Sequence, residues 1–94
     1  MDELTGFQRD VLYVIAGLDA ESPPYGLAIK EKLECGYSNE VNHGRLYPVL
    51  NQLAERGFVE KGSIDKQTNS YGLTERGHQV IEARREWENQ YVEV

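Results

Sequence analysis

Residues 42–59, NHGRLYPVLNQLAERGFV, predict a helix that ends at a glycine and leads into a strand. Asn42 is a favoured residue at a helix N-cap, and Gly57 is typical of the position just after a helix. Apolar residues recur at helical spacing and share one face: Leu46, Val49, Leu50 and Leu53. The opposite face holds Gly44, Pro48, Asn51 and Glu55. We therefore expect an amphipathic helix over about residues 42–56 with one buried and one open face.

Two further helices are predicted before this one. Residues 4–19 carry an apolar stripe of period 3.6 behind Thr5, which is the expected N-cap. Residues 24–34 predict a second helix that is closed by Gly36 and buries Leu27, Ile29 and Leu33. A short turn then leads to residue 42, so the second and third helices form a helix-turn-helix.

After Gly57 the periodicity changes from helix to strand. Residues 58–64 and 70–73 read as two short strands, and the polar residues 65–69 between them read as a hairpin turn. Thr74 is a suitable cap for a last helix, in which four apolar residues follow at steps of seven, four and three: Val80, Trp87, Tyr91 and Val94. This spacing resembles that of a coiled coil, with Arg84 as an interruption.

The element order helix, helix, helix, hairpin, helix defines the predicted fold class. It is mostly α with a small β-hairpin: a winged helix-turn-helix of three helices and a two-stranded wing, plus a C-terminal dimerisation helix. We expect a single domain over residues 1–94, with residues 5–73 as the winged-helix core and residues 74–94 as the dimerisation helix. A chain this short buries a limited core on its own, which favours a homodimer.

The charge of the chain bears on its partners. Ten Lys and Arg face sixteen Asp and Glu, a net charge of −6, which argues against nucleic acid because phosphate neutralisation uses basic residues. The acidic excess lies outside residues 41–78. This range holds five basic and four acidic residues, whereas the rest of the chain holds five basic and twelve acidic residues. The acidity therefore weakens a DNA-binding interpretation without cancelling it.

The N-terminal end of the third helix is the candidate for base recognition, because recognition helices meet base edges with their first residues. Gly44 would allow close approach, Arg45 could pair with a guanine or contact a phosphate, and Asn42 and His43 could bind phosphate oxygens. Tyr47 flanks this surface. Asn51 could read an adenine or be solvated. The structural alternative is that Gly44 and Pro48 only shape the helix and that Tyr47 is half core.

The hairpin turn is the candidate wing. Four of its residues could reach phosphates or a minor groove: Lys66, Gln67, Thr68 and Asn69. On composition, a solvated hairpin tip is an equally good interpretation.

Several motifs resemble the PadR-like transcriptional regulators. These are residues 41–50 with Leu53 and residues 57–60, the run Leu73-Thr74-Glu75-Arg76-Gly77, and residues 25–29. The resemblance covers nearly the whole chain, and the acidic composition is most similar to small haloarchaeal members of the RosR type. It implies a homodimer that binds double-stranded DNA at a palindromic operator through residues 42–47 and the wing.

The resemblance also implies that the last helix forms the dimer interface together with the first. The expected interface residues are Leu4, Phe7, Val11, Val80, Ile81, Arg84, Trp87 and Tyr91. Packing of Trp87 and Tyr91 across a dimer is the first interpretation, and a cage for a small-molecule effector is the alternative. Two departures from the family are a wing without a basic Gly-Arg-Pro-Lys tip and a C-terminal region that is too short for a large effector domain.

Other function classes find no support in the sequence. No His, Cys and carboxylate spacing suggests a metal site, and no phosphate loop or nucleophile motif suggests an enzyme or a cofactor. Cys35 lies near a helix C-terminus beside Glu34, which favours an ordinary thiol over a redox sensor. The acidic start of the chain lacks the basic residues of a signal peptide, and no apolar stretch approaches the length of a membrane span, so we expect a cytoplasmic address.

Two hypotheses remain beside the leading one. A winged-helix protein–protein interaction module without direct DNA binding would suit the negative charge. Alternatively, acidic groups that flank a DNA surface could hold cations that bridge to phosphates, in which case affinity would fall with salt less steeply than about 0.9 log units per phosphate contact.

Overall fold

A computed structural model describes residues 4–19, 23–37, 41–63 and 68–91, apart from the side chains of Tyr37 and His43. The elements are α1 (Gly6–Leu18), α2 (Gly26–Tyr37), α3 (His43–Glu55), β1 (Val59–Ser63), β2 (Asn69–Leu73) and α4 (Glu75–Asn89). This is the predicted order of three helices, a hairpin and a last helix. The predicted wing residues Lys66 and Gln67, and Val94 of the last helix, lie outside the described residues.

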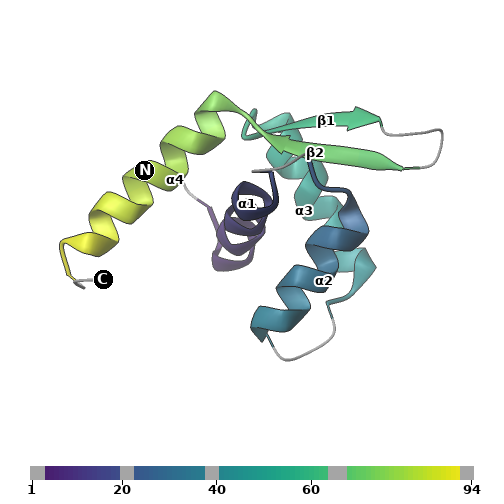
Figure 1. Ribbon diagram of the computed structural model, residues 1–94, viewed down its shortest axis with the longest axis horizontal. Helices are drawn as coiled ribbons and strands as arrows, with labels where there is room; N and C mark the ends of the chain where they lie inside the picture. Colours follow the sequence, from purple (N-terminus) through teal and green to yellow (C-terminus); the bar gives the residue numbers. More distant parts are fainter. Residues whose placement is uncertain (1–3, 20–22, 38–40, 64–67, 92–94) are drawn as a thin grey trace.

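Helix α1 lies at the centre of the fold and contacts α2, α3, α4 and β2 (Figure 1). It begins at a complete capping box, in which Gln8 N donates to Thr5 Oγ1 at 3.1 Å and Thr5 N donates to Gln8 Oε1 at 3.0 Å. At its other end, Asp19 accepts a hydrogen bond from Leu73 N at 3.1 Å. This bond fixes the end of α1 to the second strand of the hairpin.

Helix α2 departs from its predicted boundaries at both ends. It begins at Gly26 because Tyr25 is held in an antiparallel bridge to Ser70, and Tyr71 N donates to Pro24 O at 2.8 Å. It continues through Gly36 to Tyr37, so the prediction that Gly36 closes the helix was wrong. Gly36 has no positive φ, and the conformation that favours glycine is found at Gly57, where φ is 81°.

The prediction that Leu27 is buried was also wrong, because 45% of its surface is exposed. Ile29 and Leu33 are the buried residues of α2 and lie four positions apart on one face. Leu27 precedes Ile29 by two residues, which is a rotation of about 200° around the helix. Leu27, Ile29 and Leu33 therefore cannot share one face of the helix. The buried face is the one that holds Ile29 and Leu33, which are four residues apart.

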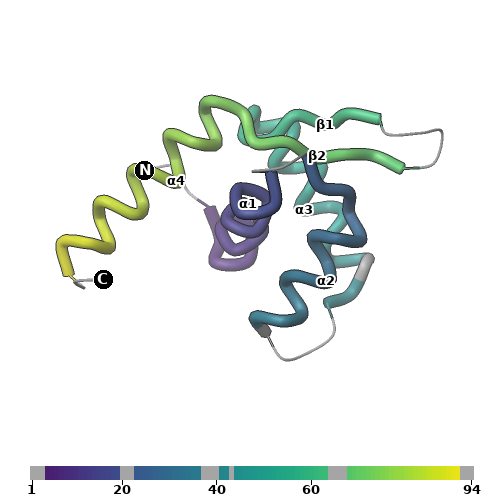
Figure 2. Tube along the Cα trace, viewed as in Figure 1, coloured from purple at the N-terminus to yellow at the C-terminus, as the bar shows by residue number. Residues whose placement is uncertain are grey.

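Helix α3 has the predicted limits, with Asn42 as N-cap and Arg56 as C-cap ahead of Gly57. Strands β1 and β2 pair antiparallel with Val59 opposite Leu73 and Ser63 opposite Asn69. Asn69 is therefore the first residue of β2 and not part of the turn. The tube in Figure 2 shows that the hairpin extends beyond the helices, in the direction away from α4.

Helix α4 starts where the hairpin meets the end of α3. The Thr74 side chain accepts from Gly77 N at 3.1 Å and donates to Gly57 O at 2.6 Å, so one residue caps α4 and fixes the α3–β1 junction. A Cβ on Gly77 would collide with the Phe58 carbonyl oxygen and come within 2.7 Å of Leu73 Cδ1. The first turn of α4 can approach the hairpin this closely only because residue 77 has no side chain.

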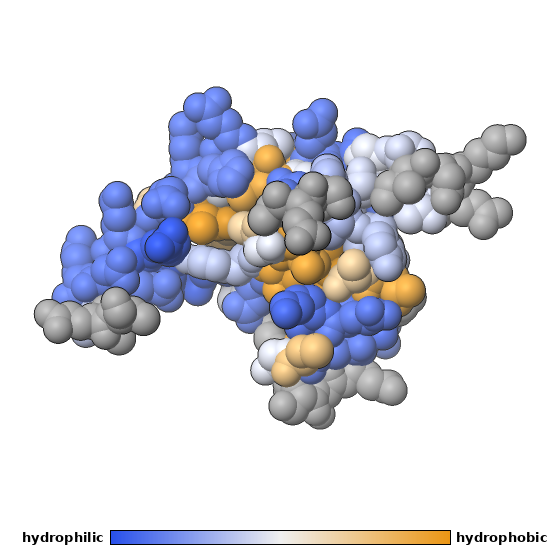
Figure 3. Space-filling model, viewed as in Figure 1, coloured by the Kyte–Doolittle hydropathy of each residue, from blue (hydrophilic) through white to orange (hydrophobic). Residues whose placement is uncertain are grey.

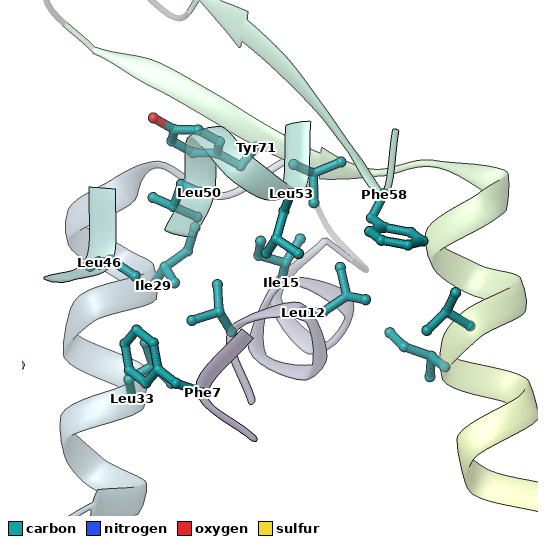
Figure 4. Close-up of a cluster of buried hydrophobic side chains, with 14 of the residues drawn as sticks. Phe7, Leu12, Ile15, Ile29, Leu33, Leu46, Leu50, Leu53, Phe58 and Tyr71 are labelled. Atoms are coloured by element: carbon teal, nitrogen blue, oxygen red, sulfur yellow. The ribbon is translucent and has the colours of Figure 1, made fainter. Parts of the chain in front are cut away.

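The core is formed by all four helices and both strands (Figure 4). Leu12 and Ile15 of α1 are fully buried in it, as are Leu46, Leu50 and Leu53 of α3. Figure 4 shows the Tyr71 ring of β2 above Leu50, with its hydroxyl directed away from the other labelled side chains. Because α3 commits its leucine face to this core, its opposite face is left open.

We predict that Gly77→Ala lowers the free energy of unfolding by about 1–3 kcal/mol, because the added methyl group overpacks the α4–hairpin junction. Thermal denaturation followed by circular dichroism measures the change. Gly36→Ala is the matched control, since nothing lies within 4 Å of a Cβ at that helical position. The control should leave stability unchanged or raise it by up to about 1 kcal/mol. Equal losses in the two variants would contradict the close packing at Gly77.

Candidate nucleic-acid interface

The outward face of α3 begins at its N-cap. Asn42 Oδ1 accepts a hydrogen bond from Gly44 N at 2.6 Å, and Gly44, Arg45, Pro48 and Asn51 are all exposed. A Cβ on Gly44 would lie 3.0 Å from Asn42 Oδ1, so the absence of a side chain also leaves room for the cap. The surface at the start of α3 is therefore low in relief, and residues 43–50 contain no acidic side chain.

Arg45 extends from this face toward the start of α1. Its guanidinium carbon lies 4.0 Å from the centre of the Phe7 ring, which is a cation–π contact. Phe7 is 9% exposed, so the ring is anchored in the core while its face supports the cation. This contact restricts the directions in which the Arg45 charge can point.

Two further contacts hold α3 in place. Glu34 Oε2 pairs with Lys30 Nζ at 2.9 Å and also accepts from Val41 N at 2.8 Å, which joins the end of α2 to the residue before the α3 cap. On the other side, Gln8 Nε2 donates to Gln52 Oε1 at 2.9 Å. The exposed face of α3 is thus oriented by hydrogen bonds from both α1 and α2.

The structure adds Lys61 to the candidate residues. Lys61 Nζ on β1 donates to Asn51 Oδ1 of α3 at 3.4 Å, and both side chains are exposed. Lys61 was not among the DNA-contact residues predicted from the sequence. The available signal was that it is the single basic residue of the predicted first strand, but a pairing across ten residues could not be read from the sequence.

A pocket of about 520 Å³ lies between α2, α3 and the hairpin. Three of the residues that line it were predicted to contact DNA: Tyr47, Thr68 and Asn69. The other lining residues were not: Tyr25, Gly26, Leu27 and Tyr71. Tyr47 is half-buried, and its ring lies directly on Gly26, where a Cβ would be 2.6 Å from the Tyr47 hydroxyl oxygen. The structure therefore joins the α3 candidates to Thr68 and Asn69 in one concave surface.

Tyr71 lies at the buried side of this pocket and is 2% exposed. Burial raises the pKa of Tyr71 above its ordinary value, and neighbouring Tyr47 raises it further, while a hydrogen bond with Asn69 acts in the opposite direction. The neutral hydroxyl form of Tyr71 is therefore favoured over the phenolate in the folded chain.

The expected dimer-interface residues differ in how much of their surface the folded chain leaves exposed. Val11 is completely buried within the chain, and Phe7, Val80 and Ile81 are 7–9% exposed, so these four residues form the chain's own core and have little surface for a partner. Leu4 is half-buried. On the outer part of α4, Trp87 and Tyr91 are 46% and 71% exposed.

The outer half of α4 extends away from the body formed by the other elements (Figure 1). The rings of Trp87 and Tyr91 contact each other there with centres 5.1 Å apart and planes tilted by 55°, and the Arg84 guanidinium lies 4.5 Å from the centre of the Trp87 ring. Arg84 also pairs with Glu88 at 3.3 Å. In Figure 3 this arm is largely hydrophilic on the visible face, whereas apolar surface is visible where the arm meets the body.

Among the residues described, no three His, Cys, Asp or Glu side chains are grouped so that they could hold a metal ion. No helix in the described ranges is long and apolar enough to span a membrane. Cys35 is exposed on α2.

A helix-turn-helix with an exposed second helix, followed by a two-stranded hairpin, defines a winged-helix DNA-binding protein. Residues 11–83 match the model of the PadR-like family of transcriptional regulators. The chain belongs to this family, which is a family of regulators and not of enzymes.

The chain is similar to solved structures of RosR from Halobacterium salinarum, a haloarchaeal winged-helix regulator. RosR in the complex RosR-S1 is 47% identical, with a TM-score of 0.85 over 93% of this chain and 74% of the other. RosR grown from NaBr is 45% identical, with a TM-score of 0.87 over 98% and 81%. F93 from STIV, a winged-helix DNA-binding protein, shares the fold at 16% identity, with a TM-score of 0.76 over 97% and 96%. A search of curated proteins found no match.

The raised pKa of Tyr71 predicts a loss of stability in alkali. The Tyr71 phenol ionises near pH 10 in the unfolded chain, whereas the folded chain keeps it protonated at that pH. The protonated phenol therefore makes its full contribution to the free energy of unfolding below pH 10. That contribution is lost as the pH rises through the pKa of Tyr71 in the folded chain. Urea denaturation between pH 8 and pH 11 measures this dependence, which Tyr71→Phe should reduce. Tyr91→Phe, at a 71% exposed tyrosine, is the control, and an identical pH dependence in both variants would contradict the prediction.

Proposed function

We propose that this PadR-like regulator acts as a homodimer that places α3 of each subunit in the major groove of a palindromic operator. The observation that supports this most directly is the exposed first half of α3, which is low in relief and carries no acidic residue. A major groove about 12 Å wide admits an α-helix. Gly44 and Pro48 keep the neighbouring part of the outward face of α3 small.

The proposed contacts lie along α3 and the hairpin. Arg45 reads a guanine or contacts a phosphate near the N-terminal end of α3, and Asn51 with Lys61 contacts the duplex farther along the helix. Asn42 and His43 contribute phosphate contacts at the helix N-terminus. Thr68 and Asn69 bring the base of the wing to the backbone, and Lys66 and Gln67 extend this contact toward the minor groove.

The proposed dimer uses the outer part of α4 together with the N-terminal part of α1. Trp87 and Tyr91 form an exposed aromatic pair on an arm that leaves the body, and aromatic residues dominate the energetics of many interfaces. In this proposal residues 1–94 form one domain, in which residues 5–73 are the winged-helix core and residues 74–94 are the dimerisation helix. A two-fold dimer requires a two-fold operator, because each half-site meets an identical α3.

We predict that Arg45→Ala weakens binding to the selected operator by about 1–3 kcal/mol and that Lys61→Ala reduces the slope of log affinity against log salt by about 1. Fluorescence anisotropy over a salt series measures both effects. Lys32→Ala is the control, because Lys32 is an exposed lysine that faces a groove between α1 and α2.

Two outcomes would count against the proposal. If no sequence-selective complex forms at any salt concentration, a protein–protein interaction module becomes the better hypothesis. If Arg45→Ala and Lys32→Ala bind equally well, α3 is not the recognition helix. Bridging cations stay a prediction, and the same salt series, repeated with different cations, tests them.

For the dimer, we predict that Trp87→Glu raises the dissociation constant of the dimer at least about tenfold, because it places a charge in an apolar contact. Sedimentation equilibrium measures the constant, and Glu86→Gln on the same turn is the control. A monomeric wild-type protein, or a dimer that tolerates Trp87→Glu, would contradict the proposed interface.

A further inference from the structure

The pocket between α2, α3 and the hairpin is lined by tyrosines, Leu27 and small or polar residues. Among the residues that the structure describes, its lining contains no Asp, Glu, Lys or Arg, although the chain has sixteen acidic residues. It offers the hydroxyl groups of Tyr25, Tyr47 and Thr68 and the amide of Asn69. The described lining is thus neutral, rich in hydrogen-bond donors, and free of carboxylates that would repel an anion.

The same pocket exposes apolar surface that the fold does not use. Tyr25 is 43% exposed and Leu27 is 45% exposed, and both lie at the start of α2. These apolar side chains are exposed to solvent in the isolated chain. Covering them with a ligand removes apolar surface from water, which makes the free energy of binding more favourable. The pocket therefore suits an occupant that has both an apolar ring and an anionic group.

The position of the pocket indicates which occupant this is. Tyr47 belongs to α3, which the proposed function places in the major groove, while Thr68 and Asn69 lead into the wing, which it places beside the minor groove. One sugar–phosphate backbone separates the two grooves of a duplex. A strand that passes from α3 to the wing must therefore cross the pocket.

We propose that this pocket binds one deoxyribose-phosphate unit of the operator backbone, an inference that rests on the proposed function. Leu27 and the tyrosine rings pack against the sugar, and the Tyr25 hydroxyl with the Thr68 and Asn69 side chains donates hydrogen bonds to the phosphate oxygens. The Tyr47 ring packs directly on Gly26, and this contact fixes the position of the ring in the pocket. Gly26 is therefore a positioning residue.

This mode of binding has a consequence that ordinary Lys and Arg contacts lack. Salt dependence arises from the counterions that cationic side chains release when they neutralise phosphates. Neutral donors and apolar contacts add affinity without that release. The pocket thus contributes affinity for DNA that high salt concentrations do not reduce, although the chain is acidic.

The test uses the full chain and a fluorescein-labelled duplex that the wild-type protein selects from a random-sequence library. Tyr25→Phe and Leu27→Ser should each raise the dissociation constant about three- to tenfold at every salt concentration, with the salt slope unchanged. Gly26→Ala should cause a similar loss with little change in melting temperature, because the flexible tip of Tyr47 moves into the pocket. Cys35→Ser, an exposed position farther along α2, is the control and should bind like the wild type.

A second arm identifies the phosphate. Each phosphate in turn is replaced by an uncharged methylphosphonate, and one position between the two grooves should weaken the wild-type complex but have a smaller effect on Tyr25→Phe. Such coupling shows that the hydroxyl contacts that phosphate.

The outcomes separate this inference from the proposed function. If Arg45→Ala weakens binding but Tyr25→Phe, Leu27→Ser and Gly26→Ala bind like the wild type, the pocket proposal is overturned and α3 recognition stands. Additive effects of Tyr25→Phe and every methylphosphonate would also overturn it. If the wild-type protein selects no duplex, both proposals are overturned.

Discussion

The burial of one leucine stripe on α3 is the constraint on which the rest of the structure depends. Leu46, Leu50 and Leu53 are fully buried, and each contributes about 1.5–3 kcal/mol relative to exposure. Rotation of α3 about its axis would bring these side chains into water, so the opposite face, with Gly44 and Asn51, has to remain outside. The hydrogen bonds of Gln8 and Glu34 then fix the direction in which that face points. Core packing and the proposed DNA contact therefore use opposite faces of one helix.

Electrostatics sets a different problem, because a chain with a net charge of −6 belongs to a family of DNA-binding regulators. Arg45 and Lys61 lie on the outward surface of α3 and β1, whereas the described lining of the neighbouring pocket carries no charged group. Affinity that comes from neutral donors and apolar contact avoids both repulsion by carboxylates and competition with salt. In the proposed complex, Arg45 and Lys61 then determine register and base preference.

Size explains the role proposed for α4. A domain of 94 residues buries a modest core, and this core already takes up Val80 and Ile81 at the start of α4. The later part of the helix leaves the body and holds its aromatic pair, Trp87 and Tyr91, outside. A helix that is anchored at one end and exposed at the other is suited to joining two subunits. The same division explains why four residues expected at the interface lie in the chain's own core instead.

The sequence by itself determined the features that arise from contacts three or four residues apart. The caps at Thr5, Asn42 and Thr74, the leucine stripe of α3, and the hairpin could be predicted because helix periods and caps are local. Only the tertiary structure decided which apolar residues of α2 face inward, so Leu27 was misplaced. It also decided that Arg45 rests on Phe7, that Lys61 reaches Asn51, and that Tyr25 joins Tyr47 in one pocket. Those pairs are ten or more residues apart, and their meeting depends on how the helices pack, which no local pattern encodes.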